Sequence, residues 1–309
     1  MLAGRRGASC DLVDRVAVKA MSSEPELLEV RDLQVEFAQR GFGPWRKSVQ
    51  VLHGVDISVR SGEVVGLVGE SGSGKTTLGN AVARLVRAKA GRIHFQGRDL
   101  LAMKSGELRR LRRSLQVVFQ NPLASFNPRF TVGSSLALPL RLHRICSRST
   151  CDAAVENAMN SVGIDASLKG RYPHELSGGQ LQRLAIARSL ALSPALIVAD
   201  EAVSKLDVSV RAQVLNLLKR KQRESNFGML FITHDLAVAR YLCQRVVVMY
   251  HGRIVESGET QRIFSHPQHD YTKVLLGRGD SRRWLEAAQG DELDDSKHRE
   301  GLRTGASTA

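Results

Sequence analysis

The sequence has few of the features that define several common protein classes: long apolar runs, aromatic side chains and paired cysteines. None of its apolar runs approaches the roughly 18 residues that a membrane-crossing helix requires, so we expect any membrane-spanning part to belong to another chain. Residues 1–20 have no continuous apolar core, which argues against a secretory signal and favours a cytoplasmic protein. The four cysteines form no Cys-x-x-Cys pair, which argues against a zinc site or a disulfide framework and fits a reducing compartment.

Positive charge, by contrast, is abundant, and the formal net charge at pH 7 is +14. Such a charge permits nucleic-acid binding, attraction to an anionic membrane surface, or an origin in an arginine-rich proteome. The basic residues are spread along the chain, with one denser run at 109–113, and only 5% of the residues are aromatic. Because basic grooves that bind single strands normally also hold stacking aromatics, we favour the last two explanations and expect no nucleic-acid partner.

Hydrophobic periodicity predicts one large α/β domain. Alternating apolar residues predict edge strands at 28–37 and 51–59, with a hairpin loop at 39–47 between them. Short, almost entirely apolar runs are typical of strands buried on both faces of a sheet. They occur at 64–68, 116–119, 196–199, 229–232 and 245–249. Helical patterns occur at 75–87, 151–162 and 181–192. The alternation of such strands with helices indicates a three-layer α/β core.

The predicted domain has a helical insertion and irregular ends. Between residues 120 and 193 helical patterns replace the strand patterns, which predicts a helical subdomain at about 121–193. Residues 1–26 are irregular and residues 277–309 are rich in charge, and we expect both segments to be disordered. The folded domain is therefore expected to span 27–276, and Met21 is an alternative start of the chain.

A phosphate-binding loop follows the first buried strand. Its motif, G-x-x-x-x-G-K-[ST], lies after an apolar strand and before a helix, which is the context that makes the match specific. The glycines let backbone N–H groups point at the phosphates, and the positive end of the next helix faces the same place. Lys75 is expected to reach the β and γ phosphates, and Thr76 to hold Mg²⁺ through its hydroxyl. The predicted nucleotide-binding residues here are Gly69, Glu70, Ser71, Gly72, Ser73, Gly74, Lys75, Thr76 and Thr77.

An acidic pair, Asp200 and Glu201, ends the buried strand at 196–199. The strand places Asp200 at the carboxyl edge of the sheet near the phosphates, where a magnesium ligand is needed. Glu201 directs its side chain elsewhere and is the natural general base for an attacking water. The two carboxylates therefore predict hydrolysis of the bound nucleotide.

A second glycine-rich turn, Leu176-Ser177-Gly178-Gly179-Gln180, lies between the phosphate loop and the acidic pair and precedes a helix. In this position the turn resembles the signature of ATP-binding cassette (ABC) proteins, and the resemblance extends from about residue 27 to about residue 276. It implies a P-loop NTPase (RecA-like) α/β fold, in which a parallel core carries an antiparallel β subdomain and a helical insertion. It also implies that the protein binds ATP and Mg²⁺.

The signature turn, residues 177–180, forms another anion-binding helix start. Since it lies on the helical insertion, it cannot fold back onto its own phosphate loop. The resemblance implies that two cassettes pack head to tail, so that each presents this turn to the γ phosphate of the other. The residues expected to act across this interface are Ser177, Gly178, Gly179 and Gln180.

The resemblance also assigns roles to residues at strand ends. Gln120 would contact Mg²⁺ and water while coupling the core to the helical insertion, and Asn121 stands where an aspartate is more usual. His234 would act as a switch that spans the water, the γ phosphate and the base. Phe37 is the best candidate for the aromatic that stacks on adenine. Phe42 and Trp45 are nearby alternatives.

The loop after the base resembles the loop that crosses the interface between two cassettes. It includes Asp207, which is expected to lie in that interface. Lys205 replaces the small residue that is usual in this loop. This departure suggests that the second cassette is a related but different subunit.

Several segments resemble the importer ATPases for peptides and nickel in particular. Residues 117–122 and 125–129 match peptide importers, and the runs 252–258 and 267–276 look like the tail of oligopeptide and dipeptide importer ATPases, although Asp270 departs from the usual proline. We therefore expect the ATP-hydrolysing, energy-coupling subunit of a membrane importer for peptides.

The resemblance implies several partners: a second ABC ATPase subunit, two membrane permease subunits and an extracytoplasmic solute-binding protein. The protein would then be peripheral, at the cytoplasmic face of a bacterial inner membrane. A nickel importer is the first alternative. A subunit of an exporter and a soluble ABC protein that acts on nucleic acid are less favoured alternatives.

Overall fold

The computed structural model describes residues 26–38 and 48–278. Its strands are β1 (Glu26–Ala38), β2 (Ser48–Arg60), β3 (Val64–Val68), β4 (Ala90–Phe95), β5 (Arg98–Asp99), β6 (Leu115–Val118), β7 (Leu196–Asp200), β8 (Gly228–Ile232), β9 (Arg245–Tyr250) and β10 (Arg253–Glu259). Its helices are α2 (Lys75–Val82), α3 (Ser105–Leu111), α4 (Pro122–Ser125), α5 (Val132–Leu142), α6 (Cys151–Ser161), α7 (Gly178–Leu190), α8 (Val208–Ser225), α9 (Leu236–Leu242), α10 (Thr260–Ser265) and α11 (Asp270–Leu275), with the 3-10 helices η1 (Ala166–Gly170) and η2 (Pro173–Glu175). The predicted loop at 39–47 and the ends expected to be disordered lie outside the described residues, apart from residues 26, 277 and 278.

The strands form two sheets. The larger sheet has the order β10-β9-β3-β8-β7-β6, in which the strands from β9 to β6 are parallel and β10 is antiparallel. Every residue of β3, β7 and β8 is buried, as expected for central strands covered on both faces. The smaller sheet has the order β2-β1-β4-β5 and is antiparallel throughout. This arrangement confirms the predicted α/β fold with a parallel core and an antiparallel β subdomain.

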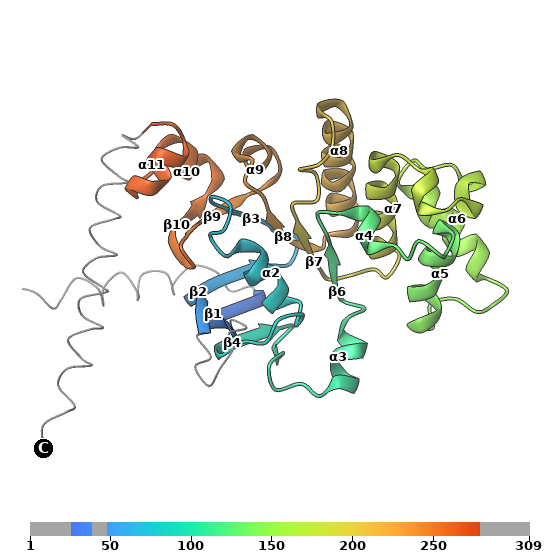
Figure 1. The fold of residues 1–309 in the computed structure, drawn as a ribbon, viewed down its shortest axis with the longest axis horizontal. Coiled ribbons are helices and arrows are strands. Elements are labelled where there is room, and N and C mark those ends of the chain that lie inside the picture. The colour runs from blue at the N-terminus through green and yellow to red at the C-terminus, as the bar shows by residue number, and fades with distance from the viewer. Residues whose placement is uncertain (1–25, 39–47, 279–309) are drawn as a thin grey trace, which may run out of the picture.

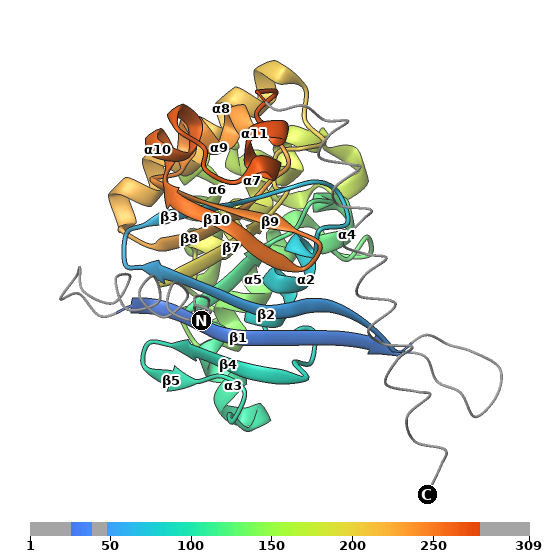
Figure 2. The same ribbon diagram turned by 90° about the vertical axis from the view of Figure 1, so that its left-hand side faces the viewer.

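Helix α2 joins the two sheets. It contacts β7 and β8 of the larger sheet and β1 and β2 of the smaller one, and the 90° views show it between them (Figures 1 and 2). The approach to β8 is close, because a Cβ atom built on Gly79 would lie 2.6 Å from Ile232 Cδ1. The start of this helix, which carries the phosphate loop, is therefore anchored to the centre of the molecule.

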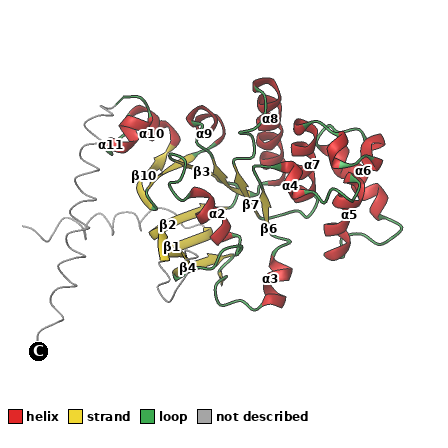
Figure 3. Cartoon of the chain, viewed as in Figure 1, coloured by secondary structure: helices red, strands yellow, loops and turns green. Residues whose placement is uncertain are grey.

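The helices between residues 122 and 190 gather beyond the β6 edge of the larger sheet (Figures 1 and 3). They enclose an apolar core of their own, in which Leu136, Met159 and Leu184 are completely buried. The signature turn belongs to this group of helices and is thus separated from α2 and its phosphate loop (Figure 1). Within the described residues, no helix combines the length and apolar character that a membrane span needs.

The predicted helix at 75–87 is wrong at its end, since α2 stops at Val82. Arg84 adopts a left-handed conformation with φ 56°, and its N–H donates to the carbonyl of Ala81. A left-handed residue closes the last turn and redirects the chain. Leu85, which lies beyond this end within the predicted range, is 49% exposed.

The expectation of no disulfide is also wrong, because Cys146 and Cys151 are bonded to each other. The turn between α5 and α6 brings their Cα atoms to 5.0 Å, within the range that a disulfide spans. Sequence spacing could not reveal this, because the pairing depends on how the turn folds. The cysteine content therefore gives no support for a reducing compartment.

Candidate active site

The phosphate loop connects the carboxyl end of β3 to the first residue of α2. Its glycines adopt conformations that other residues rarely reach, with φ 152° at Gly69, 85° at Gly72 and 104° at Gly74. At Gly69 there is also no space for a side chain, since a Cβ would lie 2.1 Å from the Met249 carbonyl oxygen. Glycine is thus required both for the turn and for the packing of the loop on β9.

The Lys75 ammonium group lies inside this loop. It donates to the carbonyl oxygens of Gly69 and Glu70 at 2.8 and 2.6 Å and to the Ser73 hydroxyl at 3.3 Å. Burial lowers the pKa of Lys75, and the negative charges of Glu201 and Asp200 oppose this effect. A phosphate group bound at the loop would supply the charge-assisted hydrogen bonds that such a poorly solvated cation favours.

Asp200 and Thr76 meet at the start of α2. The Thr76 hydroxyl donates to Asp200 Oδ1 at 3.1 Å, and Asp200 is only 8% exposed. Burial raises the pKa of Asp200, while the hydrogen bond from Thr76 lowers it. A hydroxyl beside a poorly solvated carboxylate is a set of hard oxygen ligands that suits Mg²⁺, and a cation here would compensate the buried charge.

The Glu201 carboxylate joins two other predicted site residues. Gln120 Nε2 donates to Glu201 Oε2 at 2.6 Å, and His234 Nδ1 lies 2.9 Å from Glu201 Oε1. Gln120 and His234 lie 81 and 33 positions from Glu201 in the sequence. They meet because β7 lies between β6 and β8, so that the segments after these three parallel strands emerge at one edge of the sheet.

Glu201 adopts a left-handed backbone conformation, with φ 46°. For a residue other than glycine this conformation costs about 1–2 kcal/mol. The Glu201 N–H donates to the Ile232 carbonyl at 2.9 Å, which fixes the turn against β8. The turn separates the two acidic side chains: Asp200 is directed toward Thr76, and Glu201 toward Gln120 and His234.

The signature turn caps α7. The Ser177 hydroxyl accepts from the Gln180 N–H at 3.3 Å, and Gln180 Oε1 accepts from the Ser177 N–H at 2.9 Å. A Cβ on Gly179 would lie 2.4 Å from Val210 Cγ1, so the turn packs closely on α8. Gly178, in contrast, faces open space. The start of α7 is thus anchored on one side and accessible on the other.

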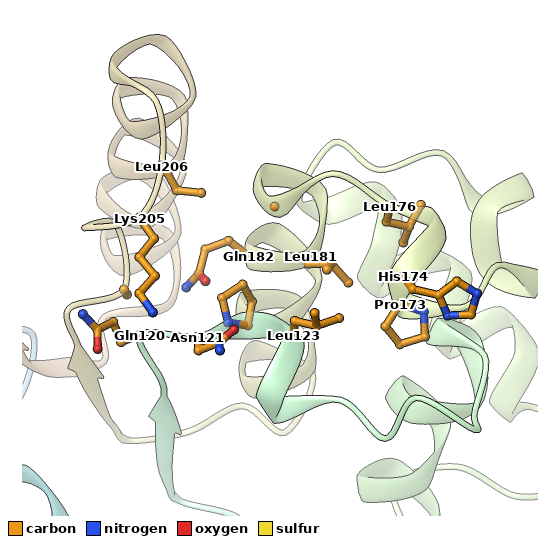
Figure 4. A pocket seen from close by; sticks show the side chains of 13 residues that line it. Gln120, Asn121, Leu123, Pro173, His174, Leu176, Leu181, Gln182, Lys205 and Leu206 are labelled. Carbon is orange, nitrogen blue, oxygen red and sulfur yellow. The ribbon is translucent and has the colours of Figure 1, made fainter.

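The loop after Glu201 lies next to the signature turn. A hollow of about 360 Å³ is lined by Gln120, Gly178 and Lys205 among others (Figure 4). No other described side chain forms a hydrogen bond or an ion pair with the ammonium group of Lys205. Asp207 is exposed, and Val208, which begins α8, is 80% exposed although it is apolar. The loop therefore presents both charge and apolar surface to the outside.

Phe37 lies next to the end of β1, where it pairs with Val49 of β2 and is 43% exposed. Its alternatives, Phe42 and Trp45, lie outside the described residues. The Phe37 side chain is thus only partly covered by the described residues.

Sequence reasoning missed three residues that contact this site or the segments next to it. Ser204 lies 3.4 Å from Gln120 Nε2 and donates to the Glu201 carbonyl, and Arg188 of α7 donates to the Ser125 carbonyl at 2.7 Å while stacking on Phe126. The Tyr271 hydroxyl accepts from the Glu70 N–H. Ser204 and Tyr271 belong to segments that the sequence had already singled out, but nothing in their spacing indicated these partners.

Comparison with known proteins identifies the family of this chain. The family described as ABC transporter matches residues 52–204. The chain is 46% identical over 255 residues to the oligopeptide transport ATP-binding protein OppF of Salmonella typhimurium, with 81% of this chain and 76% of that protein aligned. It is 43% identical over 268 residues to the glutathione import ATP-binding protein GsiA of Pectobacterium atrosepticum, with 86% of this chain and 43% of that protein aligned.

A solved structure has the same fold. It is the dimeric structure of a post-hydrolysis state of the ATP-binding cassette MJ0796 bound to ADP and Pi, with a TM-score of 0.67 and 25% sequence identity. The match covers 75% of this chain and 98% of that chain. The fold of this chain thus agrees with that of a known ATP-binding cassette.

Proposed function

The chain belongs to the ATP-binding proteins of ABC transporters, within the group of peptide importers, and we propose that it hydrolyses ATP to drive the uptake of short peptides. The observation that carries the chemical part of this proposal is the contact of Glu201 with both Gln120 and His234, beside a loop built for phosphates. The similarity to OppF and GsiA supports the peptide part.

In the proposed reaction, Lys75 and the backbone N–H groups of residues 69–77 hold the β and γ phosphates. Glu201 removes a proton from the attacking water while the oxygen of that water forms a bond to the γ phosphorus. The bond between the γ phosphorus and the oxygen that bridges to the β phosphate breaks, which releases ADP. The hydrogen bonds from Gln120 and His234 orient the Glu201 carboxylate. Gln120 also orients the water, and His234 responds to the γ phosphate as a switch.

Thr76, Asp200 and Gln120 would hold Mg²⁺. The bound ion would neutralise charge on the β and γ phosphates. A hydroxyl, a buried carboxylate and an amide supply the oxygen ligands that this cation prefers. We further propose that Phe37 stacks on the adenine ring, because it is an aromatic side chain that is 43% exposed.

Each site is proposed to be completed by a second cassette. The start of α7 is accessible at Gly178 but separated from the phosphate loop of the same chain. The signature turn would therefore contact the γ phosphate of the ATP bound to the second cassette, through Ser177, Gly178, Gly179 and Gln180. Asp207 and the exposed Val208 would lie in the same interface. The Lys205 ammonium, which has no partner among the described residues, would lie in this interface too. Because Lys205 replaces the small residue that is usual in this loop, the second cassette would be a related but different subunit.

The helical insertion, residues 121–193, would transmit the state of the nucleotide to two membrane permease subunits. Arg188 links the signature helix α7 to the segment that follows Gln120, so movement at Glu201 and Gln120 would reach both. The permeases would receive peptides from an extracytoplasmic solute-binding protein. The chain would then act at the cytoplasmic face of a bacterial inner membrane.

Reconstitution tests this function. The isolated chain should hydrolyse ATP slowly, and the rate should rise when the partner cassette, the permeases and a peptide-loaded binding protein are added. Full, substrate-regulated activity from the monomer would contradict the shared site. Deletion of the gene should impair growth on short peptides; a strain that loses nickel-dependent enzyme activity but takes up peptides normally would instead identify a nickel importer.

A further inference from the structure

The outer side of the phosphate loop is held by the C-terminal part of the described chain. The Glu70 N–H donates to the Tyr271 hydroxyl at 3.0 Å, across 201 residues of sequence. The Gly252 N–H donates to the Ser73 carbonyl at 2.9 Å, and the Met249 carbonyl closes the space beside Gly69. β9, the turn after β9 and α11 therefore hold the outer side of the loop in place.

Burial, ring packing and hydrogen bonds at the start of α11 fix the position of Tyr271. Its side chain is completely buried, and its ring packs on Tyr250 with centroids 4.3 Å apart. The Glu256 carboxylate of β10 accepts from the N–H groups of Gln268 and His269 at 2.9 and 3.1 Å, which fixes the start of α11. Burial raises the pKa of Tyr271 to about 12, so its hydroxyl stays neutral at physiological pH.

The peptide unit that Tyr271 holds also positions Lys75. The N–H of Glu70 and the carbonyl of Gly69 belong to one planar peptide group and point to opposite sides of it. Tyr271 holds the N–H side, and the carbonyl side accepts from the Lys75 ammonium at 2.8 Å. Rotation of this peptide would therefore move the carbonyl that holds the cation meant for the phosphates.

We propose that Tyr271 is a positioning residue for the nucleotide site: by fixing the Gly69–Glu70 peptide it keeps Lys75 in place, so that α11 contributes to ATP affinity without touching the phosphates. The proposal rests on the proposed function, because it assumes that the loop binds the β and γ phosphates. It gives a physical role to the run 267–276, which the sequence singled out but the reaction does not use.

Tyr271→Phe tests this role, since it removes the hydroxyl and keeps the buried ring. We expect the dissociation constant for ATP and the KM to rise about three- to tenfold, the effect of one lost hydrogen bond, while kcat changes much less. The matched control is Tyr241→Phe, which removes the hydroxyl that bonds Asn216 between α9 and α8 and should leave nucleotide affinity unchanged. ATP binding is measured by calorimetry, and kinetics are measured in the assembled importer.

A merely structural role gives a different result. In that case the melting temperature without nucleotide would fall more for Tyr271→Phe than for Tyr241→Phe, while ATP affinity stayed at the parental value, and the proposal would be overturned. Lys75→Ala in the same calorimetry separates a failure of the phosphate-site assignment from a failure of the role of Tyr271. If Lys75→Ala binds ATP normally, the phosphate-site assignment itself fails; if it loses binding and Tyr271→Phe does not weaken it, only the role of Tyr271 fails.

Discussion

Replacing Glu201 with Gln tests the assignment of the general base most directly, because the structure predicts that little else changes. The carboxylate accepts one hydrogen bond from Gln120 and makes another contact with His234 Nδ1. A glutamine in the same place can accept from Gln120 through its carbonyl oxygen, and its amide can donate to His234 Nδ1 when the neutral imidazole carries its proton on Nε2. Both contacts can therefore persist, and we expect the free energy of unfolding to change by no more than about 1 kcal/mol.

What the glutamine cannot do is accept the proton of the attacking water. The contribution of a positioned base is roughly two to four orders of magnitude, so kcat should fall by roughly 100- to 10,000-fold while ATP binding stays near the parental affinity. The variant should then accumulate with ATP bound, as a closed pair of cassettes. Phosphate release by the assembled importer at saturating ATP measures the first effect, and size-exclusion chromatography with ATP and Mg²⁺ measures the second.

The matched control is Glu224→Gln, which makes the same chemical change on α8 at an exposed carboxylate that pairs with Lys221. It should hydrolyse ATP at the parental rate. Parental turnover by Glu201→Gln would refute the assignment of the base. A large loss of stability or of ATP affinity in this variant would show that Glu201 holds the site together instead of acting in the reaction.

Three further predictions follow from the same site. Lys75→Ala removes the cation held at the loop, and the loss of charge-assisted hydrogen bonds to the phosphates should weaken ATP binding about 10- to 100-fold in calorimetry; equal affinity would contradict the role of Lys75. Asp200→Asn should raise the concentration of Mg²⁺ needed for turnover. It should also raise the melting temperature without nucleotide at neutral pH, because the pKa of Asp200 is raised in the fold and its ionisation therefore opposes folding above that pKa. This gain in melting temperature should vanish as the pH falls below about 3.9, the pKa of an aspartate in the unfolded chain, because the carboxyl is then protonated in both states. A constant gain at all pH values would contradict this explanation. Arg188→Leu breaks the link between α7 and Ser125, so the basal ATPase rate should change little while stimulation by peptide and permease is lost; normal stimulation would exclude Arg188 from the coupling.

The sequence by itself determined the local structure of the main motifs of this protein. A phosphate loop, its helix and the acidic end of a strand are encoded within short segments, since turn geometry and strand burial depend on nearby residues. The buried runs at 64–68, 196–199 and 229–232 accordingly appear as β3, β7 and β8. The roles of the predicted site residues and the domain limits remain predictions.

Only the tertiary structure decided which of these segments meet. Gln120, Glu201 and His234 lie together because the sheet order places β7 between β6 and β8, and strand order depends on contacts between distant parts of the chain. The same reason applies to the bond between Tyr271 and Glu70 and to the disulfide across the turn from α5 to α6. Local periodicity indicates which face of a segment is buried, but it does not indicate which distant segment of the chain packs on that face.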